Sequence, residues 1–167
     1  MSEMTDSRGF RTGAAISVLL LGVAALLHQN ETTRIHSAFL VAAIAAAMLL
    51  SAATSLRISL LALPFRILRD RGVIDAPKPA DLQPVPGLRL AQVMGGTMLL
   101  LGVAAHARLS ADGAAVALVV IVATLQSFLA ITGICVACKL YGIVVWFENR
   151  RRTPEGTTIP RQKIRLR

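Results

Sequence analysis

The sequence predicts an all-α integral membrane protein: a four-helix bundle with a surface amphipathic helix in its central cytoplasmic loop and a long, broken fourth helix. Apolar residues make up 54% of the chain and charged residues only 16%, whereas soluble domains average about a quarter charged residues. The apolar residues also fall into long blocks and do not alternate with polar ones, which is typical of membrane-spanning helices. A chain of 167 residues is enough for one small bundle.

The first two spans are predicted in the first third of the chain. An apolar run from Gly13 to Leu27 follows a short polar tail. The residues after this run offer no convincing small-x-small cleavage site, so we expect a membrane span and not a removed signal peptide. The second span runs from about Ala38 to Leu56 and is rich in alanine. Small side chains let membrane helices approach closely, which predicts a central place for this helix.

The connection from residue 57 to residue 89 is too basic to cross a membrane. Between Ile58 and Arg69, large apolar side chains are mixed with arginines, which indicates a helix lying at the lipid surface and interrupted near Pro64. Four prolines then fall between residues 77 and 86. Because proline and the residue before it disfavour helix, this segment is predicted to be extended and at the surface.

The third span is predicted from about Leu90 to Ala105. This span contains Gly95, Gly96 and Gly102, which are expected to mark close contacts with neighbouring helices.

The fourth apolar run, Ala114 to Phe147, is 34 residues long and contains a single charge, Lys139. A straight helix of this length would measure about 51 Å, whereas the apolar core of a bilayer is roughly 30 Å thick. The helix must therefore tilt, protrude or break, and the best place for a break is Thr132-Gly133.

The distribution of Lys and Arg predicts the orientation. With four spans, the N-terminal tail, the central connection and the C-terminal tail share one side and hold fifteen of the eighteen basic residues, whereas the two opposite loops hold one each. Because basic loops stay in the cytoplasm, we expect a multi-pass protein of the cell (inner or plasma) membrane with both termini cytoplasmic. Its parts are then a tail (1–12), a four-span domain (13–149) and a basic tail (150–167).

The net charge of +9 has a simple interpretation in a membrane protein. The basic residues flank the apolar segments, where they are expected to contact anionic lipid heads at the bilayer surface. Neither a nucleic-acid-binding motif nor a basic stripe with aromatic residues is present, so no nucleic-acid partner is expected.

Cys135 and Cys138 are the only cysteines of the chain. Their Cys-x-x-Cys spacing brings two thiols to one side of a helix turn, close enough for a disulfide or a shared metal ion. Lys139 is four residues beyond Cys135 and would share its helix face, so its charge would favour the thiolate. If a new helix begins after Gly133, the exposed backbone amides at its N-terminus would also favour the thiolate. We expect the pair inside the cytoplasmic half of the fourth helix.

The residues alone leave three interpretations of the cysteines open. They could form a redox couple, since a thiol with a low pKa is what nucleophilic disulfide exchange requires. They could simply be packed, because cysteine is a small apolar residue that is often buried. They could bind metal, although a structural zinc site normally uses four ligands and no further Cys or His is near in sequence. Lys139 favours a functional pair over simple packing, because placing a charged side chain within an apolar membrane segment costs free energy unless the charge has a role.

His28, His36 and His106 form a weaker pattern at the ends of three predicted helices. Four-span topology places all three on the outer face, near Glu31 and Asp112. A metal or proton-coupled site is conceivable there, but polar residues are common at helix ends, so interfacial capping is the simpler interpretation.

The run Gly133-Ile134-Cys135-Val136-Ala137-Cys138-Lys139-Leu140-Tyr141 resembles the Gly-aromatic-Cys-x-x-Cys-x-x-Tyr ending of a bacterial membrane family, domain-of-unknown-function family 4395. The segments 64–68 and 88–92 resemble that family's loop and the start of its third span, so the similarity covers most of residues 10 to 150. Ile134 stands where the family usually has an aromatic residue. The resemblance implies the same architecture and an association with thioredoxin-like or sulfurtransferase proteins, but no established activity.

Together, the residues and the resemblance predict a membrane thiol–disulfide redox or electron-relay component, a candidate thiol-disulfide oxidoreductase. Cys135 would be the attacking thiolate, Cys138 the resolving thiol and Lys139 the residue that lowers the thiol pKa; no bound cofactor is expected. Two other classes remain open. One is a membrane anchor or assembly subunit that docks a cytoplasmic partner, and the other is a small transporter of a sulfur-containing solute with the cysteines along its path.

Overall fold

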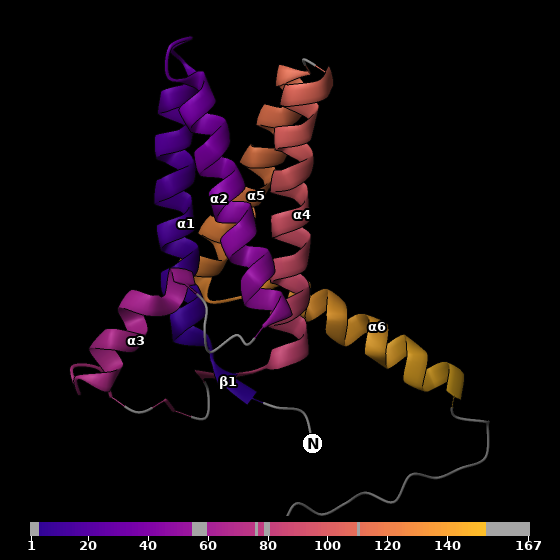
Figure 1. The fold of residues 1–167 in the computed structure, drawn as a ribbon. Helices are drawn as coiled ribbons and strands as arrows, with labels where there is room; N and C mark the ends of the chain where they lie inside the picture. The colour runs from indigo at the N-terminus through magenta and orange to yellow at the C-terminus, as the bar shows by residue number, and fades with distance from the viewer. Residues whose placement is uncertain (1–3, 55–59, 76, 79–80, 110, 153–167) are drawn as a thin grey trace, which may run out of the picture.

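The structure, a computed structural model, describes residues 4–54, 60–75, 77–78, 81–109 and 111–152. Four long helices form its body (Figure 1), and each is long and apolar enough to cross a membrane. They are α1 (Ser7–His28), α2 (Arg34–Ala53), α4 (Val85–Leu109) and α5 (Asp112–Thr132). The prediction of an all-α membrane bundle with four spans is therefore confirmed.

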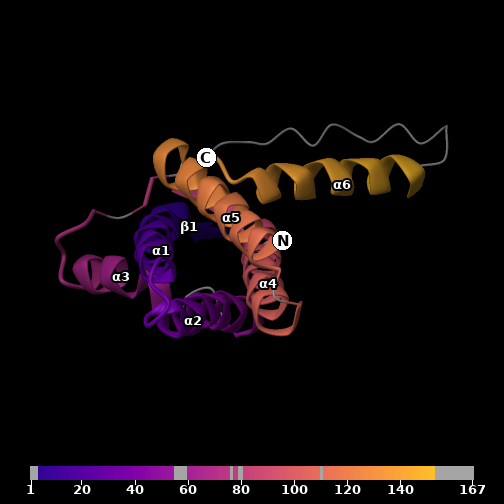
Figure 2. The ribbon, with the colours of Figure 1, turned by 90° about the horizontal axis from the view of Figure 1, so that it is seen from above.

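The four helices are arranged in a ring (Figure 2), in which α1 and α4 each contact both α2 and α5. Buried side chains from all four helices meet at its centre: Leu21, Ala24, Val41, Ile44, Ala45, Met48, Leu99 and Val122. The predicted close contact at Gly96 is present, because a Cβ placed there would lie 2.8 Å from Leu49 Cγ and 3.1 Å from the carbonyl oxygen of Ala45. Glycine thus allows α4 to pack against the backbone of α2.

Helix α1 begins at Ser7 and not at Gly13, because the polar residues before the apolar run find partners inside the protein. Asp6 caps the helix by accepting a hydrogen bond from the amide of Arg8 at 3.0 Å. The Arg11 guanidinium donates to the carbonyl oxygens of Ala130 and Ile131 at 3.3 and 3.2 Å. These carbonyls belong to the last turn of α5, where no intrahelical partner is available.

A short antiparallel sheet that the sequence did not indicate joins β1 (Met4–Asp6) to β2 (Leu82–Pro84). Directly after β2, α4 begins at Val85, whereas the third span was expected to start near Leu90. The expectation of extended chain through Pro86 is wrong, since Pro86 lies in the first helical turn. Proline is tolerated in that turn because its missing N–H would have had no intrahelical acceptor.

The predicted surface helix is present at one end of the bundle (Figure 1). A single 3-10 turn, η2 (Leu60–Ala62), leads into α3 (Leu63–Asp70). Pro64 lies in the first turn of α3, so it begins the helix and does not interrupt it. Phe65 is buried against Gly9 of α1, whereas most other side chains of α3 are exposed. The expected start at Ile58 and the expected end of the second span at Leu56 lie outside the described residues.

The fourth apolar run breaks at Gly133, as predicted. Gly133 has a φ of 72°, in the left-handed region that glycine adopts without a steric penalty. Its amide donates to the carbonyl of Leu129 at 2.9 Å, and Thr132 Oγ1 accepts from the amide of Ile134 at 3.1 Å. The chain then turns into α6 (Val136–Arg152), which leaves the bundle at a wide angle (Figures 1 and 2).

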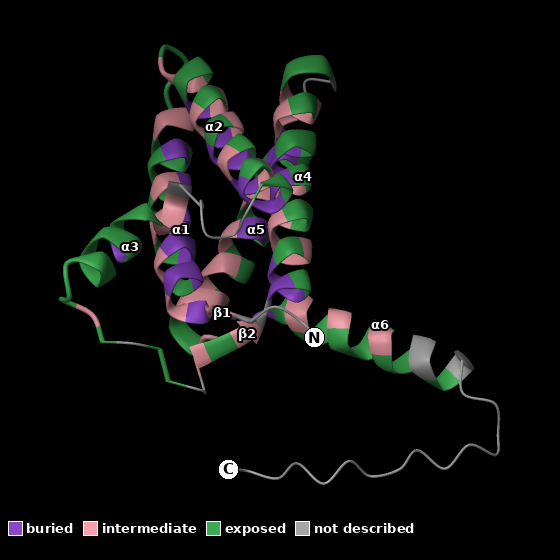
Figure 3. Ribbon diagram, turned by 60° about the horizontal axis from the view of Figure 1, so that its bottom comes forward, coloured by how far each residue is buried: buried purple, intermediate pink, exposed green. Residues whose placement is uncertain are grey.

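The start of α1, the surface helix α3 and the diverging helix α6 lie at the same end of the bundle (Figure 3). We call this end the basic end, because it holds most of the described Lys and Arg residues; Arg34 and Arg108 lie at the opposite end, at the start of α2 and the end of α4. The charge asymmetry that was counted along the sequence is therefore an asymmetry between the two ends of the bundle.

Candidate functional site

The two cysteines lie at the junction between α5 and α6. Cys135 precedes α6, and Cys138 is in the first turn of that helix. Cys135 Sγ accepts a hydrogen bond from the backbone amide of Cys138 at 3.3 Å, so its side chain caps the helix at the position where serine or aspartate often stands. Both thiols are free in this structure.

This position differs from the expected one. The pair was predicted inside the fourth span, but α5 ends at Thr132 and the cysteines follow its last residue. The reason is the break at Gly133, which turns the rest of the apolar run out of the bundle. The thiols therefore lie at the basic end of the molecule and not within the span.

Hydrogen bonding makes the two thiols chemically unequal. The thiol of Cys138, followed by the backbone amides of Cys138 and Ala137, lowers the pKa of Cys135 to about 7 against the opposing effect of burial. The pKa of Cys138 is raised, because its thiol is hydrogen-bonded to Cys135 and burial disfavours its charged form. Amides at a helix N-terminus stabilise a thiolate by the same physics that favours any anion there.

The two cysteines also face different surroundings. Cys135 is only 5% exposed and packs with Phe10, Val85 and Leu88, whereas Cys138 is partly exposed. Cys138 lies directly against Gly87 of α4, where an added Cβ would come within 3.1 Å of Cys138 Sγ and 3.2 Å of its Cα. Glycine at position 87 therefore lets α6 reach α4, a role the sequence did not indicate.

Gln83 is a second neighbour of the pair that sequence reasoning missed. Its Oε1 lies 3.9 Å from Cys138 Sγ, and its Nε2 donates to the carbonyl of Gly133 at 3.4 Å. The side chain thus connects β2 both to the break and to the second cysteine. The nearby prolines indicated an irregular segment, but no local pattern pointed to this contact.

Lys139 is exposed on α6. The expectation that it shares a helix face with Cys135 assumed that both residues lie in one helix. Cys135 is the residue before α6, and its carbonyl oxygen accepts a hydrogen bond from the amide of Lys139 at 3.1 Å, so the shared face stays a prediction. The lowered pKa of Cys135 comes from hydrogen bonds of Cys138 and Ala137, and an additional effect of Lys139 stays a prediction.

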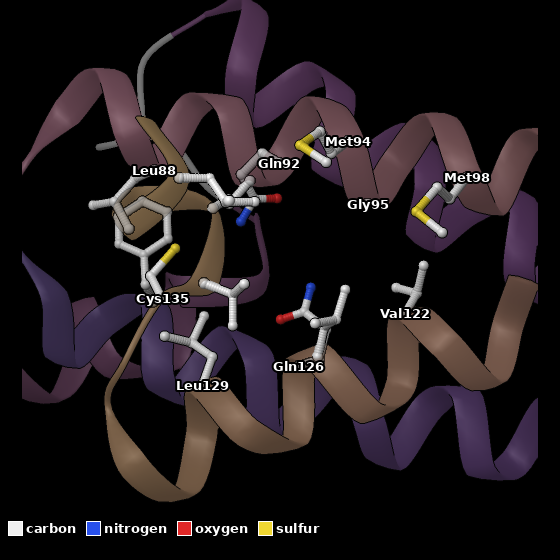
Figure 4. A pocket seen from close by; sticks show the side chains of 15 residues that line it. Leu88, Gln92, Met94, Gly95, Met98, Val122, Gln126, Leu129 and Cys135 are labelled. Atoms are coloured by element: carbon white, nitrogen blue, oxygen red, sulfur yellow. The ribbon is translucent and has the colours of Figure 1, made fainter. Parts of the chain in front are cut away.

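A cavity of about 120 Å³ lies between α4 and α5 (Figure 4), and Cys135 is at one end of it. Its walls are mostly apolar, but the amide side chains of Gln92 and Gln126 also line it. The sequence did not indicate this cavity, because its lining also includes Phe10 of α1 and residues from 135 to 140, which only the folded bundle brings beside α4 and α5.

The structure brings two of the three histidines together at the end opposite the cysteines. The rings of His28 and His106 are 5.5 Å apart, and His106 Nδ1 is 2.6 Å from Asp112 Oδ1. His36 is exposed on α2. Among the described residues, no three His, Cys, Asp or Glu side chains are grouped closely enough to hold a metal ion, so the structure adds no support for a metal site. Capping of helix ends by these residues stays a prediction.

The family model "Domain of unknown function (DUF4395)" matches residues 5–145. The chain belongs to this family. The match extends from β1 into α6 and includes both cysteines, so the resemblance that was read from the sequence is confirmed. No curated protein and no solved structure matches the DUF4395 chain.

Alkylation of Cys135 in the DUF4395 protein is expected to titrate with a midpoint near pH 7, below the ordinary thiol value of about 8.5. Iodoacetamide reacts with the thiolate, so the labelling rate across a pH series, read for each cysteine by peptide mass spectrometry, measures this midpoint. Cys138→Ala removes the largest cause of the lowered pKa and should move the midpoint upward. Lys139→Met will do the same only if the ammonium also stabilises the thiolate. A wild-type midpoint at the ordinary value would contradict the assignment.

Proposed function

We propose that this DUF4395 protein is a thiol–disulfide redox or electron-relay component of the membrane, with Cys135 and Cys138 as its couple. The observation that carries the proposal is the hydrogen bond from the Cys138 amide to Cys135 Sγ at 3.3 Å. It places one thiol at a helix N-terminus, where the thiolate is stabilised, and the other within the same helical turn. Merely packed cysteines would not need this arrangement.

The two cysteines have distinct roles in exchange with a thioredoxin-like or sulfur-transfer partner. When the partner carries a disulfide, the Cys135 thiolate attacks one of its sulfurs and the other sulfur leaves as a thiolate. The thiolate of Cys138 then attacks Cys135 Sγ, closing the internal disulfide and releasing the reduced partner. In the reverse direction, a partner thiolate attacks Cys138, the more exposed sulfur, and Cys135 leaves. Its lower pKa makes Cys135 the better leaving group.

The orientation is part of the proposal. We place the basic end in the cytoplasm of a cell that carries the protein in its inner or plasma membrane, because basic residues are retained on that side. Helix α6 supports a position at the lipid surface: its apolar side chains are exposed, and the Arg150 guanidinium lies 4.2 Å from the ring centroid of Trp146. Aromatic and basic residues together are typical of a membrane interface.

The proposal is tested by following the redox state and accessibility of the thiols in intact membranes. We expect a fraction of the pair to resist a membrane-impermeant maleimide until a reductant is added. After reduction, Cys138 should be labelled in inverted vesicles and stay protected in intact spheroplasts. A pair that remains reduced in intact membranes and unlabelled from either side would indicate packing, and labelling from the outside alone would reverse the orientation.

A non-enzymatic membrane anchor or assembly subunit is the second candidate. Helix α6 favours it, because this helix diverges from the bundle and exposes Ile143, Val144 and Phe147. A protein partner could cover these side chains as well as lipid could. An anchor would keep its function without thiols, so a variant lacking both cysteines separates the two candidates.

A further inference from the structure

The cavity beside Cys135 has the size of a single ring. Its volume is about 120 Å³, whereas a dry protein cavity of about 150 Å³ with apolar walls binds benzene. Most of the lining is aliphatic or thioether, including Leu88, Met98 and Val122. At the rim, Met94 and Leu125 are about 44% exposed, so a lipid-soluble molecule can enter from the side of the bundle that faces the bilayer.

Two amide side chains add hydrogen-bonding groups to the otherwise apolar lining of this cavity. Gln92 from α4 and Gln126 from α5 both reach into the space between the helices (Figure 4). Gln92 Oε1 is buried and has no hydrogen-bond partner among the described residues. Gln126 Nε2 donates to Met48 Sδ at 3.9 Å, and a thioether is a weak acceptor. Buried polar atoms normally find good partners, so both amides are available to a ligand with polar atoms on its ring.

The chemistry of an amide narrows the class of ligand. Each glutamine can donate to a carbonyl through its NH₂ group and accept from a hydroxyl through its oxygen. A ring that exchanges two carbonyls for two hydroxyls would keep hydrogen-bond partners in both states. Such a ring, soluble in lipid and able to take up two electrons, is a quinone.

We propose that this cavity binds the ring of a membrane benzoquinone, which takes the two electrons of the Cys135–Cys138 dithiol. The proposal rests on the proposed function of the pair and adds its electron acceptor. The ring would enter from the lipid side, and the substituents and tail that a space of about 120 Å³ cannot hold would stay outside the cavity.

The reaction balances without another reagent. The two S–H bonds of Cys135 and Cys138 break, one S–S bond forms between them, and two electrons and two protons are released. The quinone takes up both electrons and both protons, and its two carbonyl groups become the hydroxyl groups of the hydroquinone.

The different surroundings of the two sulfurs assign a direction to the relay. Cys135 faces the cavity, and Cys138 faces Gln83 and is partly exposed at the basic end. A thiolate of a water-soluble dithiol partner therefore attacks Cys138, which reduces the internal disulfide and oxidises the partner. The restored dithiol then passes its electrons through Cys135 to the ring. Electrons flow from the soluble partner to the membrane quinone.

The test uses the full chain in lipid nanodiscs and ubiquinone-1, a single-ring benzoquinone with a short tail. Reduced wild-type protein should convert one ubiquinone-1 to its hydroquinone for each disulfide formed. Binding is measured separately by equilibrium dialysis on the Cys135→Ser, Cys138→Ser variant. On that background Gln92→Leu and Gln126→Leu should each weaken ubiquinone-1 binding about tenfold, the effect of one lost hydrogen bond. Gln29→Leu, an exposed glutamine at the opposite end, is the matched control.

The outcomes separate this proposal from the one on which it rests. If wild-type protein exchanges with oxidised glutathione but does not reduce ubiquinone-1, the quinone site is wrong and the thiol couple stands. The quinone site is also wrong, and the thiol couple again stands, if Gln92→Leu and Gln126→Leu bind ubiquinone-1 as tightly as Gln29→Leu does. If the protein neither exchanges with a disulfide nor reduces the quinone, both proposals are wrong.

Discussion

Cys135→Ser and Cys138→Ser are each expected to reduce thiol–disulfide exchange to the background rate while the bundle stays folded. Exchange needs two sulfurs, one to attack and one to resolve the mixed disulfide. The fold should tolerate both changes, because serine is nearly the same size as cysteine. At position 135 the hydroxyl can also accept the Cys138 amide hydrogen bond, which serine does well as a helix cap. The stability loss should stay within about 1 kcal/mol.

The two single variants should differ in the intermediate that accumulates. When the partner carries a disulfide, Cys138→Ser keeps the attacking thiol of Cys135, to which the amide of residue 138 still donates, and lacks the resolving thiol, so a mixed disulfide with the partner should be trapped. Cys135→Ser keeps only Cys138, and it should trap less, because burial disfavours the charged form of the Cys138 thiol. Non-reducing electrophoresis of membranes from cells expressing each variant measures both amounts, and reduction of the sample should release the partner.

The double variant decides between redox chemistry and packing. If the pair only packs, the Cys135→Ser, Cys138→Ser protein will support growth and bind its partner like the wild type. That result would favour the anchor interpretation. Loss of function with unchanged helix content and melting temperature would support the couple.

Gly87→Leu is expected to give the second large effect, because it separates α6 from α4 at the cysteine pair. Even a Cβ at this position would lie 3.1 Å from Cys138 Sγ and 3.2 Å from its Cα, and a leucine needs much more room. Helix α6 must move away, which displaces Cys138 from Gln83 and exposes Cys135. Overpacking of this kind costs about 1–3 kcal/mol. Exchange should fall at least about tenfold, since the geometry of both thiols is lost.

Gly142→Leu is the matched control on α6. A Cβ at Gly142 would meet nothing within 4 Å, so leucine there should not destabilise the protein and should leave exchange unaltered; its higher helix propensity favours α6 by up to about 1 kcal/mol. The four spans should survive in both variants, because the central buried cluster lies in α1, α2, α4 and α5. Thermal unfolding and exchange rates measured in parallel would contradict the inference if the two glycine variants behaved alike.

Much of the fold could be predicted from the sequence because it depends on local properties. The spans follow from runs of apolar residues that are long enough for the bilayer, and the surface helix follows from apolar side chains mixed with arginine. A run of 34 residues is too long for one straight span and must tilt, protrude or break. Glycine is a poor helix former, which made Thr132-Gly133 the best place for a break. The cysteine pair could also be identified from the sequence, by its Cys-x-x-Cys spacing.

Tertiary contacts decided where the helices begin and what surrounds the cysteines. Helix α1 extends to Ser7 because Arg11 reaches the end of α5, and α4 starts before the expected Leu90 because β2 pairs with β1. Cys138 touches Gly87, which is far away in sequence, and Cys135 borders a cavity between two other helices. None of these contacts leaves a periodic or compositional signal.

The sequence by itself therefore determined that the chain forms a four-span bundle with a cysteine pair next to a helix break, because hydropathy and chain length act locally along the backbone. Only the tertiary structure decided that the pair lies outside the span, that its two thiols differ in pKa and exposure, and that Gln92 and Gln126 face one cavity beside Cys135. These properties depend on which distant residues the packing of the helices brings together, and packing is a property of the whole bundle.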